Sequence, residues 1–460
     1  MLLRGQRRPG LILVGVFLFG IVFSIYKIHN VDGFPPYVQK WAEGAFSSSE
    51  RHRGQYFNST WRNPTDATTT GSSQPEAMDM STSHNILLSA STYDQRYFPI
   101  TFGTYEAMNP NIIPHPQLHD TWVIVAQQRL EDSTSRPTEI SCNAVFSEGA
   151  LRCIEQPVAL PIPATFGPHC RDDLAYLAFN YGPHDARVFY GPTTPYALYG
   201  SNSAYTCFGQ WIQDFAILVD WEEQLGDWGF PVPTDLQRPL PYRPIEKNWF
   251  VFWDNHGQIY IHHDIYPQRV FARLNLDGSI GPDLAPLAST SDQLCAARYM
   301  PKAGDTLESI HQATNSLLIT LCQRADSTCR PDTTNTYIMT IFQHKTFYSY
   351  HSVYEPYLML FSQQAPFEIR AISRKPFWIN GRGKPGENRP DYLPLKPTDP
   401  WNQTEMLYMT SMSWKAHGQK YHGYSDDQVF FAFGIEDKQT GGIDILAEDL
   451  MQDLGWCNLA

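Results

Sequence analysis

Residues 182–190 place an acidic side chain close to a basic one at the start of an apolar run. Asp185 precedes Arg187 by two residues, and β-branched and aromatic side chains follow at 188–190 and 196–199. A carboxylate presented at the start of a rigid strand can exchange a proton with a sugar hydroxyl. We therefore predict that Asp185 is a catalytic proton-transfer group; the simpler alternative is that it caps a turn or pairs with Arg187.

Basic side chains elsewhere could hold a phosphate or a nucleoside diphosphate, both of which require fixed positive charge. The candidates for this role are Arg187, Lys247, His344, Lys345 and Arg374. Glu246 and Asn248 flank Lys247 and are further candidate substrate-binding residues, although Lys247 could simply pair with Glu246. His311 begins a polar segment that could face a central channel or form an ordinary turn.

Two acidic segments near the C-terminus are candidate sugar-binding elements. The loop 421–427 combines aromatic side chains with His422, Asp426 and Asp427, which suits stacking on a sugar face and accepting its hydroxyls. Asp437 follows in a glycine-containing turn, where it either binds sugar hydroxyls or caps the turn. We predict that the loop and Asp437 share one site with Asp185.

The sequence gives little indication of a metal site. It contains no Asp-x-Asp motif, and its adjacent acidic pairs, 172–173 and 426–427, would point to opposite faces of a strand. The sequence therefore predicts a metal-independent site with no cofactor, in which a nucleotide sugar such as GDP-mannose would be a substrate.

The chain beyond residue 100 consists of short runs rich in β-branched and aromatic residues, separated by Gly, Pro, Asn and Asp. A module of a polar loop followed by two or three such runs begins near Asn109, Asp185, Lys247, His311 and Met409. Five modules predict an all-β, five-bladed β-propeller. A pair of β-sandwiches is the alternative, but the charged or amide residues that open each module are typical of strands lining a central channel.

In this order the modules resemble the five-bladed mannoside phosphorylases and related mannosyltransferases, and the fungal β-mannosyltransferases of cell-wall glycan synthesis. The resemblance spans roughly residues 100 to 455 and is carried by segments 109–112 with 122–125, 184–188, 246–249 with 260–267, and 433–437.

The resemblance also implies roles for single residues. Asp185 matches the acid of the family's Glu-Asp-Pro-Arg motif, which exchanges a proton with the glycosidic oxygen, although the residues at 184 and 186 depart from that motif. Asp437 matches an Asp that holds sugar hydroxyls. Lys247 and Asn248 fall where the family contacts phosphate or sugar.

The N-terminal part predicts a membrane anchor and a spacer. Three Arg in residues 1–10 precede an uncharged, almost wholly apolar run, so we expect a cytosolic tail, a transmembrane signal anchor at 11–27 and a type II orientation. A cleaved signal peptide is the alternative. Residues 28–94 are polar and predict a flexible stem, and residues 95–460 would form the luminal propeller.

Cysteine usage agrees with a luminal body. All eight Cys lie beyond residue 140 without CxxC spacing, which favours disulfides over zinc. Cys142 with Cys153, and Cys322 with Cys329, bracket short segments and could staple hairpins; the other pairings stay open. Sequons at positions 58 and 402 would be glycosylated in such a compartment.

The formal net charge of −13, from 34 basic and 47 acidic residues, argues against a nucleic-acid surface. Anchor, stem and sugar-site propeller together predict a Golgi type II glycosyltransferase, an inverting mannosyltransferase acting on glycans. The alternatives are a glycoside hydrolase or phosphorylase acting on mannosides, and a non-catalytic glycan-binding propeller. Hydrolysis would need a second carboxylate to activate water, and the sequence does not identify one.

Overall fold

The computed structural model describes residues 79–129, 136–179, 181–221, 229–304, 307–348, 350–393 and 400–457. All of them lie in a compact unit that spans Thr70–Ala460. The predicted tail, the anchor at 11–27 and most of the predicted stem lie outside the described residues. Within the described part, no helix has the length and apolar character needed to cross a membrane.

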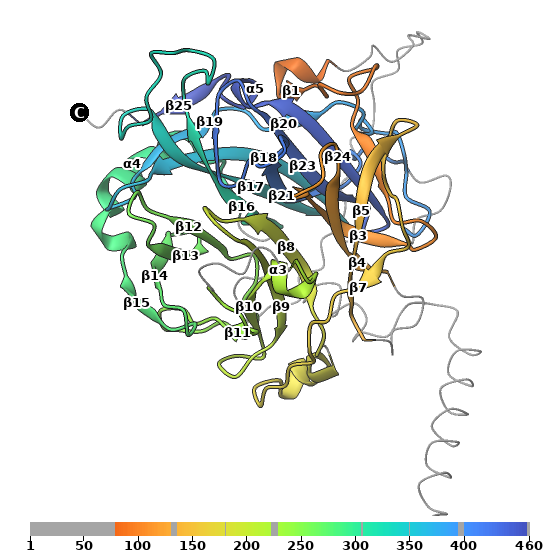
Figure 1. The fold of residues 1–460 in the computed structure, drawn as a ribbon. Helices are drawn as coiled ribbons and strands as arrows, with labels where there is room; N and C mark the ends of the chain where they lie inside the picture. The colour runs from red at the N-terminus through yellow and green to blue at the C-terminus, as the bar shows by residue number, and fades with distance from the viewer. Residues whose placement is uncertain are drawn as a thin grey trace, which may run out of the picture. The chain divides into compact units, whose positions relative to one another are not determined.

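Five antiparallel groups of four strands, called sheets I to V, make up an all-β, propeller-like fold (Figure 1). Groups II and III are separate four-stranded sheets, group IV lies within a six-stranded sheet, and groups I and V lie within one nine-stranded sheet. Sheet I holds β3 (Ala107–Pro114), β4 (Trp122–Gln128), β5 (Glu139–Ser147) and β6 (Ala150–Cys153). Sheet II holds β8 (His184–Tyr190), β9 (Pro195–Asn202), β10 (Phe208–Asp214) and β11 (Thr234–Asp235). Sheet III holds β12 (Phe250–Trp253), β13 (Ile259–Asp264), β14 (Val270–Leu274) and β15 (Ile280–Asp283).

Sheets IV and V complete the set. Sheet IV holds β16 (Glu308–Thr320), β17 (Thr336–Tyr348), β18 (His351–Ser362) and β19 (Ile369–Ser373), with β22 (His422–Tyr424) and β25 (Leu454–Trp456) at its two edges. Sheet V holds β21 (Leu407–Trp414), β23 (Gln428–Ile435), β24 (Gln439–Leu446) and β2 (Phe98–Thr101). The short strands are β1 (Asn85–Leu87), β7 (Val158–Ala159) and β20 (Phe377–Ile379), and the helices are η1 (Met80–Thr82), η2 (Asp172–Phe179), α3 (Phe215–Leu218), η4 (Ala285–Leu287), α4 (Ser289–Tyr299) and α5 (Ala447–Leu450).

The first strand of each sheet lies toward the centre. Strand β21 contacts β3, β8 and β16, strand β8 contacts β3 and β16, and β12 contacts β16. Each of the five predicted module starts falls within three residues of the first residue of one of these strands. The all-β prediction is therefore confirmed, and the sheets are arranged around a common axis, not as two packed sandwiches (Figure 1).

Strand β2 joins the beginning of the body to its end. Phe98 and Pro99 pair antiparallel with Gly442 and Gly441 of β24, and the next two residues of β2 pair in parallel with β6. A Cβ at Gly442 would lie 2.7 Å from the Phe98 ring, so only glycine allows this close approach. Sheets I and V are thus one continuous sheet.

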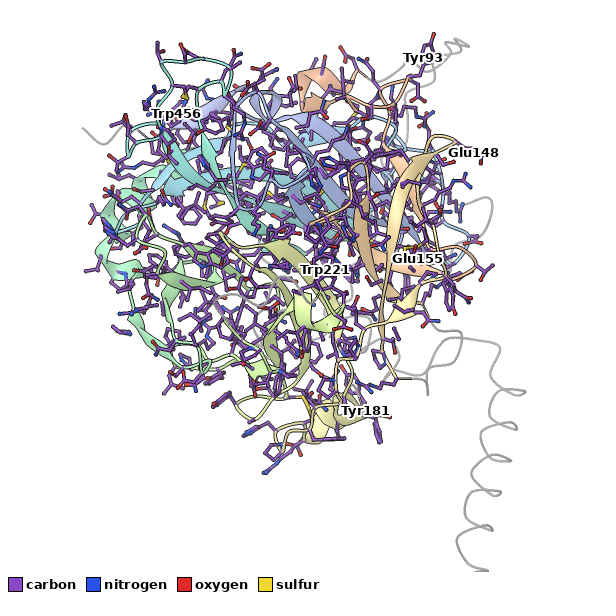
Figure 2. All side chains as sticks on the ribbon, in the orientation of Figure 1. Tyr93, Glu148, Glu155, Tyr181, Trp221 and Trp456 are labelled. Atoms are coloured by element: carbon purple, nitrogen blue, oxygen red, sulfur yellow. A yellow bond between two sulfur atoms is a disulfide. The ribbon has the colours of Figure 1, made fainter. Side chains whose placement is uncertain are left out.

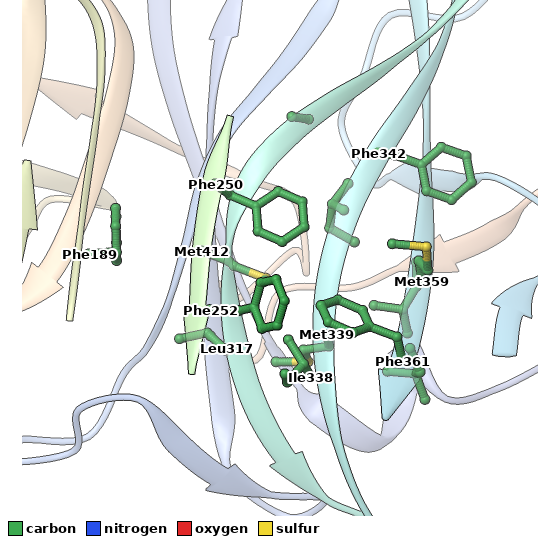
Figure 3. Packing of buried hydrophobic residues seen from close by; sticks show 14 of the residues in the cluster. Phe189, Phe250, Phe252, Leu317, Ile338, Met339, Phe342, Met359, Phe361 and Met412 are labelled. Atoms are coloured by element: carbon green, nitrogen blue, oxygen red, sulfur yellow. The ribbon is translucent and has the colours of Figure 1, made fainter. Parts of the chain in front are cut away.

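Aromatic and aliphatic side chains fill the space between neighbouring sheets. Phe250 and Phe252 of β12 face Phe361 of β18, with ring centroids 6.4 and 5.2 Å apart (Figure 3). Burial of each such side chain contributes about 1.5–3 kcal/mol. The aromatic runs that predicted strands are therefore also the contacts that hold adjacent sheets together.

All eight cysteines are paired. The predicted disulfides Cys142–Cys153 and Cys322–Cys329 are confirmed. The two pairings that the sequence left open are Cys170–Cys207 and Cys295–Cys457. The last of these ties α4 to the segment that follows β25, and so fixes the C-terminal end of the body to sheet III and sheet IV.

Residues 79–94, which were expected in the stem, belong to the folded body. They include η1 and β1, and β1 pairs in parallel with β20. Ser89 donates a hydrogen bond to Asp444 of β24 at 2.6 Å, whereas Tyr93 is fully exposed at the periphery (Figure 2). The predicted boundary at residue 95 is therefore too late: the body begins no later than Asp79.

Candidate active site

Near the start of three central strands lies an Asn or Asp whose backbone is left-handed. The φ angles of Asn109, Asp185 and Asn248 are 56°, 49° and 61°. Asn and Asp tolerate this conformation better than other non-glycine residues, and such strained positions cluster at functional sites. Asn109 lies within a β-bulge of β3 and Asp185 within a β-bulge of β8, where the regular alternation of side chains is interrupted.

Hydrogen bonds link these residues around the axis. Asn109 Nδ2 donates to Asp185 Oδ1 at 2.6 Å. Arg187 Nη2 donates to the Tyr408 hydroxyl at 3.2 Å, and that hydroxyl donates to Asn248 Oδ1 at 3.2 Å. The first bond connects sheet I to sheet II. The other two connect sheet II, through sheet V, to the residues just before sheet III, and all of them lie at the same end of the central strands.

Arg187 is buried and held in one orientation beside Asp185. Its Nε donates to the carbonyl of Ala313 at 3.0 Å, and its Nη1 donates to the carbonyl of Asp185 at 2.7 Å. The guanidinium also lies over the Tyr408 ring. The predicted Asp185 and Arg187 therefore do lie together, but Arg187 contacts the backbone of Asp185 and places a fixed positive charge in the site.

Asp437 enters the same site from the turn between β23 and β24. Burial, together with the negative charges of Asp185 and Glu436, raises the pKa of Asp437 to about 6. Asp185 and Asp437 come from sheets II and V, so this electrostatic coupling acts between two separate sheets. The charge of Asp185 acts on Asp437, as a site shared by the two carboxylates requires.

Two lysines accompany the carboxylates. Burial lowers the pKa of Lys247, while the charges of Asp185 and Asp437 oppose that effect. Lys345 of β17 is only 3% exposed, and burial followed by repulsion from Lys247 lowers its pKa to about 7. Near neutral pH the site can therefore change its number of protons through Lys345 as well as through Asp437.

Two of the candidate histidines, His311 and His344, lie in different surroundings. His311 is buried, and burial together with the charges of Lys345 and Lys247 lowers its pKa to about 3, so it is neutral in the site. Its Nε2 is 2.7 Å from Ser309 Oγ. His344 lies 3.3 Å from Glu308 and is one of the charges that act on His311.

Two residues of sheet I that the sequence did not reveal support Asp185 from behind. Gln127 Oε1 accepts a hydrogen bond from the backbone N–H of Asp185 at 3.1 Å, and Glu139 Oε1 accepts one from Ala186 at 3.2 Å. Glu139 is fully buried, and burial raises its pKa to about 8. Gln127 and Glu139 face each other across β4 and β5. The sequence did contain a signal for these two residues: each is a polar side chain at the end of an otherwise apolar strand.

Glu246 is a structural residue. It is buried and forms an ion pair at 2.8 Å with Arg238, which also pairs with Asp264. Its carboxylate also accepts a hydrogen bond from the backbone N–H of Arg243 at 2.7 Å. Arg374, another candidate phosphate ligand, lies 3.7 Å from Asp453 on the surface.

The loop 421–427 is held in place by residues at and just after the end of β16. His422 Nε2 lies 2.8 Å from Thr320 Oγ1. Asp426 accepts a hydrogen bond from the backbone N–H of Arg324 at 2.6 Å, and Asp427 forms an ion pair with the Arg324 guanidinium at 2.5 Å. These side chains order the loop against the segment that follows β16.

The prediction that this loop shares a site with Asp185 and Asp437 is wrong. The loop precedes β23 and Asp437 follows it, so the eight residues of β23 separate them. A strand of that length spans about 26 Å. His422, Asp426 and Asp427 therefore lie at the opposite end of the central strands from the carboxylates.

Within the described ranges, no three His, Cys, Asp or Glu side chains converge in a way that could hold a metal ion. The side chains that do converge are two carboxylates, two lysines, one arginine, and the amides and hydroxyl that link them. This set can donate, accept and stabilise protons and negative charge on a polar substrate.

The sequence matches no family model and no curated protein. Solved structures with a similar outline include the catalytic domain of a Coprinopsis cinerea α-L-arabinofuranosidase (TM-score 0.37, 9% identity, covering 76% of this chain and 96% of that chain). A putative exo-β-1,3-galactanase from Bifidobacterium bifidum gives a TM-score of 0.35 at 10% identity, covering 76% and 91% of the two chains. A Bacillus subtilis arabinanase gives 0.34 at 8% identity, covering 74% and 95%. Likeness at this level assigns neither a family nor an activity.

Proposed function

We propose that the chain is an enzyme that cleaves glycosidic bonds, of the hydrolase or phosphorylase class. The observation that carries the proposal is the second carboxylate. Cleavage with inversion needs one carboxyl group as acid and another as base on opposite sides of the bond. The charge of Asp185 acts on Asp437, which the sequence had suggested only as a sugar-binding residue, and Asp437 would supply this second carboxyl group.

Asp437 is the proposed general acid. A catalytic carboxylic acid needs a pKa near the working pH, and burial and the charge of Asp185 hold the pKa of Asp437 at about 6. Asp185 would then act as the base that takes a proton from the attacking group. Arg187, Asn109 and the peptide contacts of Gln127 and Glu139 keep its carboxylate in place.

The lysines favour phosphate over water as the attacking group. Lys247 and Lys345 bring two amines to the two carboxylates, and phosphate binding would shift Lys345 toward its charged form. Phosphorolysis of a mannoside, as the resemblance implies, is the finer form of this proposal. The substrate would then be a mannosidic linkage in a glycan.

Mannosyl transfer is the second candidate, and the same cationic groups support it. A diphosphate leaving group such as that of GDP-mannose needs fixed positive charge, which Arg187 and the two lysines could supply without a metal. This candidate includes the Golgi luminal location and the anchor at 11–27.

Product analysis tests these functions. The full chain is incubated with β-mannobiose and other disaccharides, with and without phosphate, and separately with GDP-mannose and an acceptor. Phosphorolysis yields a sugar 1-phosphate only when phosphate is present, hydrolysis yields free sugar in either case, and transfer consumes GDP-mannose. Asp185→Asn is the inactive control. If no reaction occurs in any arm, or if Asp185→Asn is as active as the wild type, the proposed function fails.

A further inference from the structure

The turn that carries Asp437 has a backbone conformation that one of its residues does not favour. It joins β23 to β24, and the φ angles of Glu436 and Asp437 are 51° and 50°. The backbone N–H of Lys438 donates to the carbonyl of Ile435 at 2.9 Å. Two positive φ angles with this hydrogen bond are the pattern of a type I′ turn, whose central positions are usually Asn and Gly. Asp tolerates the left-handed region but Glu does so poorly, so other contacts must hold Glu436 in place.

Those contacts converge on the Glu436 carboxylate. The backbone N–H of Met406 donates to Oε1 at 2.6 Å, and the Tyr392 hydroxyl donates to Oε2 at 2.7 Å. His351 Nε2 lies 3.1 Å from Oε1 and 3.2 Å from Oε2. The backbone N–H of Glu436 in turn donates to the carbonyl of Met406 at 3.1 Å. The first residue of β18 in sheet IV and the segment before β21 of sheet V therefore hold one side chain between them.

The residue on the other side of Asp437 is held by the same segment. Lys438 Nζ lies 2.5 Å from Asp391 Oδ1 and 4.7 Å from the centroid of the Tyr392 ring. The Asp391 side chain is 87% exposed, and an ion pair with so exposed a partner contributes little stability. The buried contacts of Glu436 are therefore the ones that fix the turn.

Glu436 acts on the site only indirectly. Its side chain is 10% exposed, and both of its oxygens already accept hydrogen bonds, so it is not placed to exchange a proton with a substrate. Its charge does reach Asp437. Burial, followed by the negative charges of Asp185 and Glu436, raises the pKa of Asp437 to about 6, and the charges of Lys345 and His351 oppose this shift.

We propose that Glu436 is a positioning residue: the hydrogen bonds on its carboxylate hold the strained turn and thereby fix the Asp437 carboxyl group in the catalytic site. His351 and Tyr392 act through Glu436. A displacement of about 1 Å in a catalytic constellation can cost about 100-fold in rate, so a turn held this firmly has a direct consequence for turnover. The acid role of Asp437 rests on the proposed function, whereas the way in which its turn is held does not.

A titration that needs no turnover tests the position of Asp437. Carbon NMR of protein labelled at the Asp carboxyl carbons follows its protonation, and Asp437→Asn identifies its signal. Tyr392→Phe removes one hydrogen bond and retains the charge of Glu436. If the turn then relaxes, Asp437 moves toward solvent, and its midpoint should decrease from about 6 toward the ordinary value for Asp, about 4.

Tyr260→Phe is the matched control for this titration. The Tyr260 hydroxyl also donates to a carboxylate, that of Asp254 at 3.1 Å, but at the opposite end of the central strands. The midpoint of Asp437 should stay at its wild-type value in this variant. An unchanged midpoint in Tyr392→Phe, or an equal decrease in both variants, would overturn the inference.

Kinetics test the consequence for the reaction. Tyr392→Phe should lower kcat/KM for an oligosaccharide about tenfold, and Glu436→Gln, which places an amide among hydrogen-bond donors, about 100-fold. The loss on a nitrophenyl glycoside should be about threefold or less, because its leaving group departs without a proton. Equal losses on both substrates would show general damage to the site and contradict a positioning role. A wild type inactive on both substrates would instead count against the proposed function, and the titration would still decide the position of Asp437.

Discussion

Replacing Asp437 with asparagine keeps the size of the side chain and removes its exchangeable proton. Because the pKa of Asp437 is raised to about 6, the group is protonated in roughly nine molecules of ten at pH 5 and in roughly one of ten at pH 7. If Asp437 is the general acid, turnover by the wild type should fall about tenfold for each pH unit above 6.

The size of the loss should depend on the leaving group. A sugar alcohol is a poor leaving group and needs the proton, so Asp437→Asn should lower kcat/KM for an oligosaccharide by about 100- to 10,000-fold. A nitrophenolate departs without a proton, so the loss on a nitrophenyl glycoside should be about threefold or less. With the nitrophenyl glycoside, the decrease in kcat/KM of the wild type above pH 6 should disappear.

The assay compares kcat/KM for both substrates from pH 4.5 to 8 in the wild type and in Asp437→Asn. Asp426→Asn is a matched control, because Asp426 lies at the other end of β23 and binds only Arg324 and Ala325 backbone N–H groups. Equal losses on both substrates, or an alkaline limb that persists in Asp437→Asn, would refute the acid role.

Other substitutions and treatments test the rest of the site. Asp185→Asn should lower turnover by about 100-fold or more with little change in Tm, and near-full activity would exclude it as the proton-transfer group. Glu139→Gln keeps the acceptor for Ala186; because burial raises the pKa of Glu139 from 4.5 to about 8, the stability of the wild type relative to Glu139→Gln should decrease as the pH rises through that interval, measured by urea unfolding at pH 5 and pH 8. Treatment with EDTA followed by dialysis should leave turnover unchanged, and restoration by added divalent ions after a loss would contradict a metal-independent site. A sequon tag at the C-terminus should be glycosylated in cells; an unmodified tag in cells that glycosylate Asn58 would exclude the luminal orientation.

The sheets and the position of Asp185 could be predicted from local sequence because polar residues directly before an apolar run mark the start of a strand. Asn109, Asp185 and Lys247 each stand at or just before a central strand, so the periodic pattern was sufficient to place them at one axis. Glu139 could not be found in this way. Its partner is the peptide bond of Ala186, 47 residues away, and only the packing of sheet I against sheet II brings them together.

The error over the loop 421–427 has a different cause. Aromatic and acidic residues around a turn have the same composition at either end of a propeller, so composition does not reveal which end a loop occupies. Chain direction does: the apolar run at residues 428–433 is typical of a strand, and a loop before a strand cannot share an end with the turn after it. That signal was present in the sequence and would have separated Asp427 from Asp437.

The pairing of β2 with β24 also constrains how the body can assemble during synthesis. The Thr440 hydroxyl donates to the carbonyl of Ile100 across 340 residues of chain. Until β24 leaves the ribosome, β2 has no antiparallel partner, and afterwards β24 presents an open edge until β2 docks on it. Open edges invite pairing with other chains. A polypeptide truncated before β24 would therefore leave β2 without its antiparallel partner, and we expect such a fragment to be prone to pairing with other chains.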